Sequence, residues 1–490
     1  MSFLKNVIYW LLEVAAFFAT CYLFLLCLYP LMILMVVKLL ITKRHEPEKK
    51  DKNEVTLGIF HPYCNAGAGG ERVLWAVVKA LQTNYDNVHI FIYTGDVEHD
   101  REKIISNVEK VFDFKLKKDN ISIVYLHRRK WVEAKMYPVC TLLGQAIGSI
   151  WLGMEALALF KPDVYIDTMG YAFTYPLFKY VGGCKVASYT HYPMISTDML
   201  SLVSQRSTTY NNRHLIARNS ILTHLKLGYY RGIAFLYGLA GKTADIVMVN
   251  SSWTKDHINS IWKCPQRTHL LYPPCDVEKL VQLPLISDET KSKEIRLVSV
   301  SQFRPEKNHA LMIEVMNKIK SSINEETWPK VHLILVGSCR NEDDESYVRK
   351  LKDLVTLLNI KDNVQFKMNI PYDQLISEMQ QGTIGIHAMW NEHFGISVVD
   401  ALAAGLIMVA HASGGPKADI IDTRDKTRNG YLAKEVDKYA KTIVSIINMS
   451  TEEKNRIRSA ARKSVERFST KGFEQEFTKI VESLFKLKQR

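Results

Sequence analysis

From about residue 55 onward, short apolar runs alternate with longer stretches of helical periodicity. One group of these runs precedes residue 250 and a second follows residue 295. Strands separated by helices form parallel sheets from βαβ units. The pattern therefore predicts an α/β protein with two Rossmann-like, doubly wound domains and a ligand cleft at the carboxyl ends of their strands. The predicted strands cover residues 55–60, 89–93, 122–125, 163–166, 185–189, 244–249, 296–300, 331–336, 364–366, 383–386 and 406–410.

A polar segment at 284–294, rich in serine, lysine and acidic residues, favours a linker between the two groups of strands. We therefore predict an anchor with a basic flank over residues 1–45, a first Rossmann-like domain over 46–284 and a second over 285–460. A helical pattern in the remaining segment, 461–490, predicts a helix that packs back across the domains.

The N-terminal region predicts a membrane anchor. Residues 14–37 carry no charged side chain and exceed the roughly 20 residues that a membrane-spanning helix needs. A cleaved signal peptide is the alternative, but its apolar core would be shorter, about 7–15 residues. One lysine precedes the segment and several lysines and arginines follow it, which places the rest of the chain in the cytosol.

Two internal apolar stretches, 142–160 and 221–240, contain interspersed aromatic residues. Core helices and helices that touch the membrane interface both fit this composition.

Composition narrows the class of partner. The 490 residues carry a formal net charge of +13, which favours nucleic acid, a phosphate-bearing substrate or a membrane surface. The predicted anchor argues against nucleic acid. The eight cysteines form no CxxC pair, which argues against a zinc site or a disulfide framework and fits a reducing compartment.

A glycine-rich turn with Gly67, Gly69 and Gly70 follows the first predicted strand and precedes a helical pattern at 73–81. Such a turn lets the backbone approach a ligand and directs helix amides at an anion. A tight turn without a ligand is an alternative. A dinucleotide-binding turn is another, although the spacing departs from GxGxxG.

The second group of strands carries charged candidates. Arg304 and Lys307 follow the predicted strand 296–300, and paired cations at this position suit a pyrophosphate. A solvated helix start is the alternative. Glu392 and Asp400 are separated by seven residues, with Glu392 expected in a loop and Asp400 one to two turns into the next helix. A loop carboxylate there can accept hydrogen bonds from sugar hydroxyls.

Together, these motifs resemble the retaining glycosyltransferases of the two-domain GT-B type, family 4, over residues 55–480. Finer features are similar to the endoplasmic reticulum α-1,2-mannosyltransferases that build the lipid-linked precursor of N-glycans. These features include His191-Tyr-Pro, Asn250-Ser-Ser-Trp and Trp390-Asn-Glu-His-Phe-Gly.

The resemblance implies an activity and its partners. The donor would be GDP-mannose, and the acceptor a dolichol-pyrophosphate-linked oligosaccharide with a trimannosyl core, extended by two mannoses on the cytosolic face of the endoplasmic reticulum membrane. Configuration would be retained without a metal or other cofactor. Other mannosyltransferases of the same pathway are the expected protein partners.

The resemblance also implies roles for single residues. Lys307 and Arg304 would bind the donor phosphates, Glu392 would face the reacting carbon, and Asp400 would take the ribose hydroxyls. The remaining expected contacts are the amides of Phe394, Gly395 and Ile396 on the donor, His191 beside the transferred sugar, and Gly67, Gly69 and Gly70 on the acceptor side.

Two positions depart from the family pattern, which usually has glutamate where this chain has Asp400 and arginine where it has Gln302. His191 taken alone also fits a core histidine. Two other functions stay open: a family 4 enzyme that transfers a UDP-sugar to a lipid, and a non-catalytic subunit that retains the fold.

Overall fold

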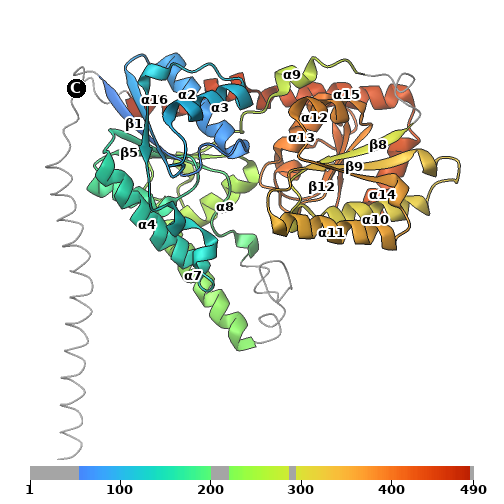
Figure 1. Cartoon of the computed structure of the whole chain (residues 1–490), viewed down its shortest axis with the longest axis horizontal. Helices are drawn as coiled ribbons and strands as arrows, with labels where there is room; N and C mark the ends of the chain where they lie inside the picture. The colour runs from blue at the N-terminus through green and yellow to red at the C-terminus, as the bar shows by residue number, and fades with distance from the viewer. Residues whose placement is uncertain (1–53, 200–219, 286–293, 486–490) are drawn as a thin grey trace, which may run out of the picture.

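The computed structural model describes residues 54–199, 220–285 and 294–485. The predicted anchor at 14–37 and most of the predicted linker lie outside these ranges. The described chain forms two α/β units that lie side by side (Figure 1).

The first unit contains a seven-stranded parallel sheet in the order β3-β2-β1-β4-β5-β6-β7. Its central strands are buried on both faces, which agrees with their mostly apolar sequences. The strands are β1 (Val55–Phe60), β2 (Val88–Thr94), β3 (Ile121–Tyr125), β4 (Val164–Asp167), β5 (Lys185–Thr190), β6 (Ile246–Val249) and β7 (Thr268–Leu270). The helices are α2 (Gly69–Asn84), α3 (Arg101–Phe112), α4 (Thr141–Leu159), α7 (Ser220–Gly241) and α8 (Ser252–Trp262).

The second unit contains a six-stranded parallel sheet in the order β10-β9-β8-β11-β12-β13. The strands are β8 (Ile295–Val300), β9 (Val331–Gly337), β10 (Val364–Met368), β11 (Ile384–His387), β12 (Ile407–His411) and β13 (Gly430–Ala433). The helices are α9 (Val277–Val281), which packs in the core of this unit, α10 (His309–Lys320), α11 (Glu342–Leu357), α12 (Tyr372–Gln381), α13 (Ile396–Ala404), α14 (Val436–Ile447), α15 (Thr451–Val465) and α16 (Thr470–Phe485).

Both sheets reverse their strand order once, between β1 and β4 and between β8 and β11. This is the doubly wound topology, in which ligands bind beyond the carboxyl ends of the strands at the reversal. The predicted fold class and all of the predicted strands are confirmed. The short edge strands β7 and β13 were not predicted, because their half-exposed sequences lack a sustained apolar run.

The last helix, α16, returns to the first unit (Figure 1). Phe473 and Phe477 are buried in the hydrophobic core of that unit, together with side chains of α2. Near the end of α16, the ring of Phe485 stacks on Tyr85 with their centroids 4.4 Å apart. The helix predicted at the C-terminus therefore joins the two units.

Helix α4 is the one helix in the described ranges that is long and apolar enough to span a membrane. In the most apolar window of α4, 39% of the residues are buried inside the protein. Leu143, Ile147, Ile150 and Trp151 are exposed along one stripe of it. Helix α4 is therefore a partly buried helix with an apolar outer face.

Candidate functional site

A cavity of about 640 Å³ lies where the two units face each other. The first unit contributes its glycine turn and the segment after β5. The second contributes the loops after β8, β9 and β11 and the first turns of α13. Ten of the predicted site residues line the cavity: Gly67, Gly69, Gly70, His191, Lys307, Glu392, Phe394, Gly395, Ile396 and Asp400.

The glycine turn brings the first unit into close contact with the second. A Cβ atom on Gly69 would lie 2.9 Å from the Ile396 side chain at the start of α13. Gly67 has a φ of +73°, in the left-handed region that favours glycine. The small residues of this turn therefore let the backbone form one wall of the cavity.

His191 lies on the same wall and belongs to a chain of polar contacts. Its Nε2 donates to the Thr168 carbonyl oxygen at 3.0 Å, so this nitrogen carries the proton. The Thr168 hydroxyl lies 2.7 Å from Nδ1 of the buried His61. His61 Nε2 lies 4.0 Å from Glu71, and Glu71 accepts from the Ala68 amide at 2.8 Å, in the glycine turn.

The electrostatics of this chain keep His191 neutral. Burial, together with the nearby His61, lowers its pKa to about 4. For Glu71, burial opposes ionisation, but the contact with His61 outweighs it and lowers the pKa. At neutral pH, His191 therefore presents an uncharged imidazole to the cavity.

Glu392 and Lys307 form an ion pair in the centre of the opposite wall. Lys307 Nζ lies 2.5 Å from Glu392 Oε2, and His387 Nε2 lies 3.1 Å from the same oxygen. Burial alone would raise the pKa of Glu392, but the His387 hydrogen bond and the Lys307 charge hold it well below its usual range. Glu392 is therefore ionised at any working pH.

A second glycine turn fixes the loop that carries Glu392. The Gly415 amide donates to the Glu392 carbonyl oxygen at 2.8 Å, and the Asn391 amide donates to Ser413 Oγ at 2.7 Å. Gly414 has a φ of +60°, and a Cβ atom there would lie 2.2 Å from the Glu392 carbonyl oxygen. The turn at 413–415 is thus a support for the Glu392 loop.

Helix α13 points its N-terminus at the cavity. Gly395 caps the helix with a φ of +109°, and its small size leaves the first turn accessible. The Phe394 ring is buried between Tyr272 and Phe468, with centroid separations of 5.8 and 5.3 Å, so it is a packing residue. The positive end of the helix dipole and Lys307 together favour an anion in this part of the cavity.

Asp400, on α13, is the one carboxylate of the cavity with an elevated pKa. Burial raises its pKa to about 7, Arg72 opposes the shift and Asp276 adds to it. Its Oδ1 atom is shielded from solvent and has no hydrogen-bond partner among the residues that the structure describes. A buried acceptor of this kind suits a ligand that brings its own donors, such as a hydroxyl pair.

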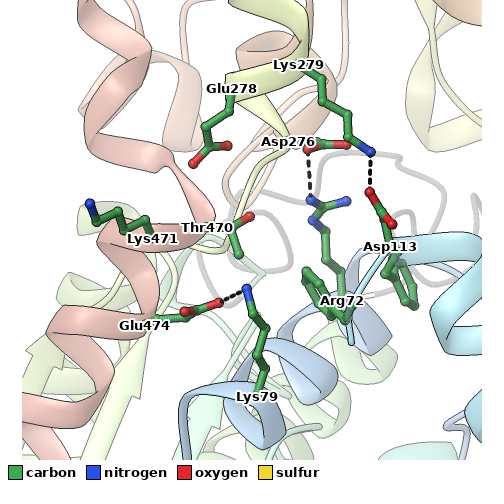
Figure 2. Close-up of a pocket in the computed structure, with 11 residues that line it drawn as sticks. Arg72, Lys79, Asp113, Asp276, Glu278, Lys279, Thr470, Lys471 and Glu474 are labelled. Atoms are coloured by element: carbon green, nitrogen blue, oxygen red, sulfur yellow. Dashed lines mark hydrogen bonds and ion pairs between the residues drawn. The ribbon is translucent and has the colours of Figure 1, made fainter. Parts of the chain in front are cut away.

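Arg72 and Asp276 belong to a separate, smaller cavity of about 370 Å³ (Figure 2). Its charged side chains are largely paired with one another across the junction of the two units. The pairs are Arg72–Asp276 at 3.6 Å, Lys279–Asp113 at 2.9 Å and Lys79–Glu474 at 2.8 Å. The charges of Arg72 and Asp276 influence the pKa of Asp400. The ion pairs of this cavity connect the two units.

Arg304 is the one predicted site residue that the structure does not bring into the large cavity. Its side chain is 41% exposed and lies 3.9 Å from Glu306, at the start of a short helix. Gln302, the position of the usual family arginine, does line the cavity and accepts from Arg340 at 3.0 Å.

Comparisons with known proteins identify the family. Residues 54–262 match the family model described as ALG11 mannosyltransferase N-terminus, and residues 286–464 match glycosyl transferases group 1. A human protein named GDP-Man:Man(3)GlcNAc(2)-PP-Dol alpha-1,2-mannosyltransferase is 48% identical over 464 residues, which cover 94% of each chain. The chain belongs to the ALG11 mannosyltransferase family. A Dictyostelium discoideum relative with the same name is 44% identical, covering 89% of this chain and 86% of its own.

Solved structures support the fold of this ALG11 family member. The Anabaena protein HepE, in complex with UDP and glucose, aligns with a TM-score of 0.60 at 15% identity, over 88% of this chain and 100% of its own. A sucrose-phosphate synthase from Thermosynechococcus elongatus aligns with a TM-score of 0.61 at 16% identity, over 88% and 99%. The GT-B fold expected from the sequence is therefore confirmed.

Sequence reasoning missed four polar residues of the site: His61, Glu71, Thr168 and His387. His61, Thr168 and His387 follow the carboxyl ends of predicted strands, and Glu71 adjoins the glycine turn, so these positions are the signal that could have found them. In the described part of the chain, no group of three or more His, Cys, Asp or Glu residues is placed to hold a metal ion.

Proposed function

We propose that this chain is a retaining α-1,2-mannosyltransferase. It transfers mannose from GDP-mannose to the dolichol-pyrophosphate-linked Man(3)GlcNAc(2) oligosaccharide that its relatives' names specify. The observation that carries the proposal is the Lys307–Glu392 ion pair beside the N-terminus of α13, in a cavity between two doubly wound sheets. This arrangement provides one anion site and one permanent carboxylate side by side.

The donor fits this cavity in one orientation. The pyrophosphate lies at the start of α13, where the helix dipole and Lys307 neutralise its charge. Asp400 accepts hydrogen bonds from the ribose hydroxyls. The mannose then lies between Glu392 and His191. Lys307 exchanges its partner Glu392 for the phosphate when the donor binds.

The reaction needs no side-chain base. The bond from the anomeric carbon to the phosphate oxygen breaks, and the acceptor hydroxyl forms its bond on the same face. The proton of that hydroxyl passes to the leaving phosphate oxygen. Glu392 stabilises the oxocarbenium-like carbon by its negative charge, and Lys307 stabilises the leaving phosphate. We propose that the reaction is independent of metal ions.

The relatives' name implies action in the endoplasmic reticulum. We propose that residues 14–37 anchor the chain in that membrane and that both α/β units face the cytosol, on the grounds of length, hydropathy and flanking charge. The same cytosolic location would allow contact with other mannosyltransferases of the pathway.

A transfer assay with the purified full-length chain tests the proposal. Radiolabelled GDP-mannose and UDP-sugars are compared as donors on a defined lipid-linked trimannosyl acceptor. We expect transfer only from GDP-mannose, and an α-1,2 linkage in the product. Transfer from a UDP-sugar alone would contradict the donor assignment. The absence of both transfer and donor binding would favour a non-catalytic role.

A further inference from the structure

A second large cavity, of about 480 Å³, adjoins the donor cavity. His393, next to Glu392, lines both cavities. The second cavity also reaches Leu142 and Gln145 in the first turns of α4. We call this second cavity the α4 groove. A molecule in the α4 groove would therefore have one end beside the reacting centre.

The walls of the α4 groove are apolar and aromatic, with a few neutral polar groups. None of the described residues that line it is an aspartate, glutamate, lysine or arginine. Burial lowers the pKa of His393, which keeps this histidine uncharged at neutral pH. The groove therefore suits a neutral ligand and excludes the pyrophosphate of either substrate as its occupant.

Aromatic faces dominate the groove near His393. The Tyr192 ring stacks on His393 with centroids 4.9 Å apart and planes inclined by 19°, and the Trp253 centroid lies 5.4 Å from His393. Tyr192 is 55% exposed and Trp390 is 48% exposed, although both lie at the junction of the two units. Large exposed aromatic side chains in a cleft mark a site for a ligand with flat apolar faces.

Two side-chain amides also line the groove. Asn391 Nδ2 donates to Asp198 of the first unit at 2.6 Å, and Gln145 Nε2 donates to the Val132 carbonyl oxygen at 2.8 Å. Each amide retains further hydrogen-bonding capacity. Stacking faces combined with neutral amides match the apolar faces and hydroxyl groups of a sugar.

From these observations we infer that the α4 groove binds the neutral mannosyl units of the acceptor oligosaccharide, with Trp390 and Tyr192 as the stacking residues. This inference rests on the proposed function. The acceptor hydroxyl must reach the anomeric carbon beside Glu392. The sugars closest to that hydroxyl must therefore occupy the space next to Glu392. The α4 groove adjoins that position through His393.

The test compares Trp390→Ala with Trp151→Ala in the full-length chain. Trp151 is also 48% exposed, but it lies on the outer face of α4 and does not line the groove. We expect Trp390→Ala to raise the KM for the acceptor about tenfold or more, the size of one anchoring aromatic contact. The KM for GDP-mannose and the slow hydrolysis of GDP-mannose without acceptor should be unchanged, and Trp390→Phe should restore most of the acceptor affinity.

Two acceptor series separate sugar from lipid recognition. In the first series, the isoprenoid length of the acceptor varies while its saccharide stays the same. In the second series, one acceptor is used and free mannotriose is added as a competitor. We expect the Trp390→Ala penalty to be independent of isoprenoid length, and mannotriose to compete with the acceptor in the wild type more strongly than in the variant. A penalty that grows with isoprenoid length, or an unchanged acceptor KM, would overturn the inference. Wild-type protein that transfers no mannose would instead overturn the proposed function.

Discussion

At the scale of single residues, the Lys307–Glu392 pair carries the proposed chemistry. Each group compensates the other's charge in the absence of substrate. Among the described residues, Lys307 also contacts Met389, and Glu392 also contacts His387. Donor binding replaces this internal compensation by the charges of the phosphate and of the reacting carbon. The pair is thus arranged for a charge distribution that only the reaction creates.

Replacing either member should remove this stabilisation. We expect Lys307→Ala and Glu392→Gln each to lower kcat by a factor on the order of 10²–10³. Lys417→Ala is the control, since Lys417 is exposed and does not line the cavity. Initial rates at saturating donor and acceptor provide the measurement, with circular dichroism to verify folding. Wild-type kcat in either variant would refute the assigned site.

Arg304 offers a sharper comparison, because it was predicted alongside Lys307 but lies outside the cavity. We expect Arg304→Ala to retain most of the activity that Lys307→Ala loses. The two variants are compared in the same assay of kcat and donor KM. Equal losses would mean that Arg304 moves into the cavity when the donor binds.

The elevated pKa of Asp400 predicts a pH dependence of donor binding. An ionised carboxylate accepts both ribose hydroxyls, so donor binding favours the ionised form. Since the pKa is about 7, GDP-mannose affinity should rise as the pH increases through 7 and level off above it. Asp400→Asn should remove this dependence. Calorimetric titrations of donor between pH 6 and 8 provide the measurement, and a flat profile in the wild type would contradict the ribose assignment.

At the scale of elements, the chain places its chemistry where strands end and helices begin. The β1, β8 and β11 strands end in the loops that carry the glycine turn, Lys307 and Glu392. These strands are mostly apolar, so the sequence predicts both the strands and the edge at which the loops gather. For this reason, the sequence alone could place three motifs in one cleft: Gly69-Gly70, Lys307 and Glu392.

Other features depend on contacts that no local pattern shows. Arg304 and Lys307 are only three positions apart in the sequence. Which of them faces the cavity depends on the orientation of the short helix after β8, and the local sequence does not show that orientation. The His61–Thr168–His191 contacts join three separate strand ends. The support of the Glu392 loop by the turn at 413–415 also requires knowledge of which loops adjoin.

The support turn makes a testable prediction. Gly414→Ala would force a Cβ atom to within 2.2 Å of the Glu392 carbonyl oxygen, so the Glu392 loop must shift. We expect kcat to fall by about 10²-fold, the effect of a displacement of roughly 1 Å at a reacting group. The control is Gly183→Ala, since Gly183 has a similar φ of +68° and no atom within 4 Å of the added Cβ. Equal kcat values for the two variants would contradict the role of the turn.

At the scale of the whole molecule, the two sheets, the returning helix α16 and the ion pairs at the junction build one enzyme from two similar halves. One half supplies the glycine turn and His191, the other supplies the anion site, Glu392 and Asp400, and both halves line the α4 groove. The fold also accounts for part of the positive net charge of the sequence. Some of these charges lie at the proposed donor phosphate site, and others flank the predicted anchor.

The measurement that tests the central claim most directly is mannose transfer by purified full-length protein. GDP-[¹⁴C]mannose is supplied with a synthetic lipid-pyrophosphate-linked Man(3)GlcNAc(2) acceptor, and the product is digested with an α-1,2-specific mannosidase. Our account predicts transfer by the wild type, release of the label by the mannosidase, and loss of transfer in Lys307→Ala and Glu392→Gln. Label that resists the mannosidase, or undiminished transfer in both variants, would contradict it.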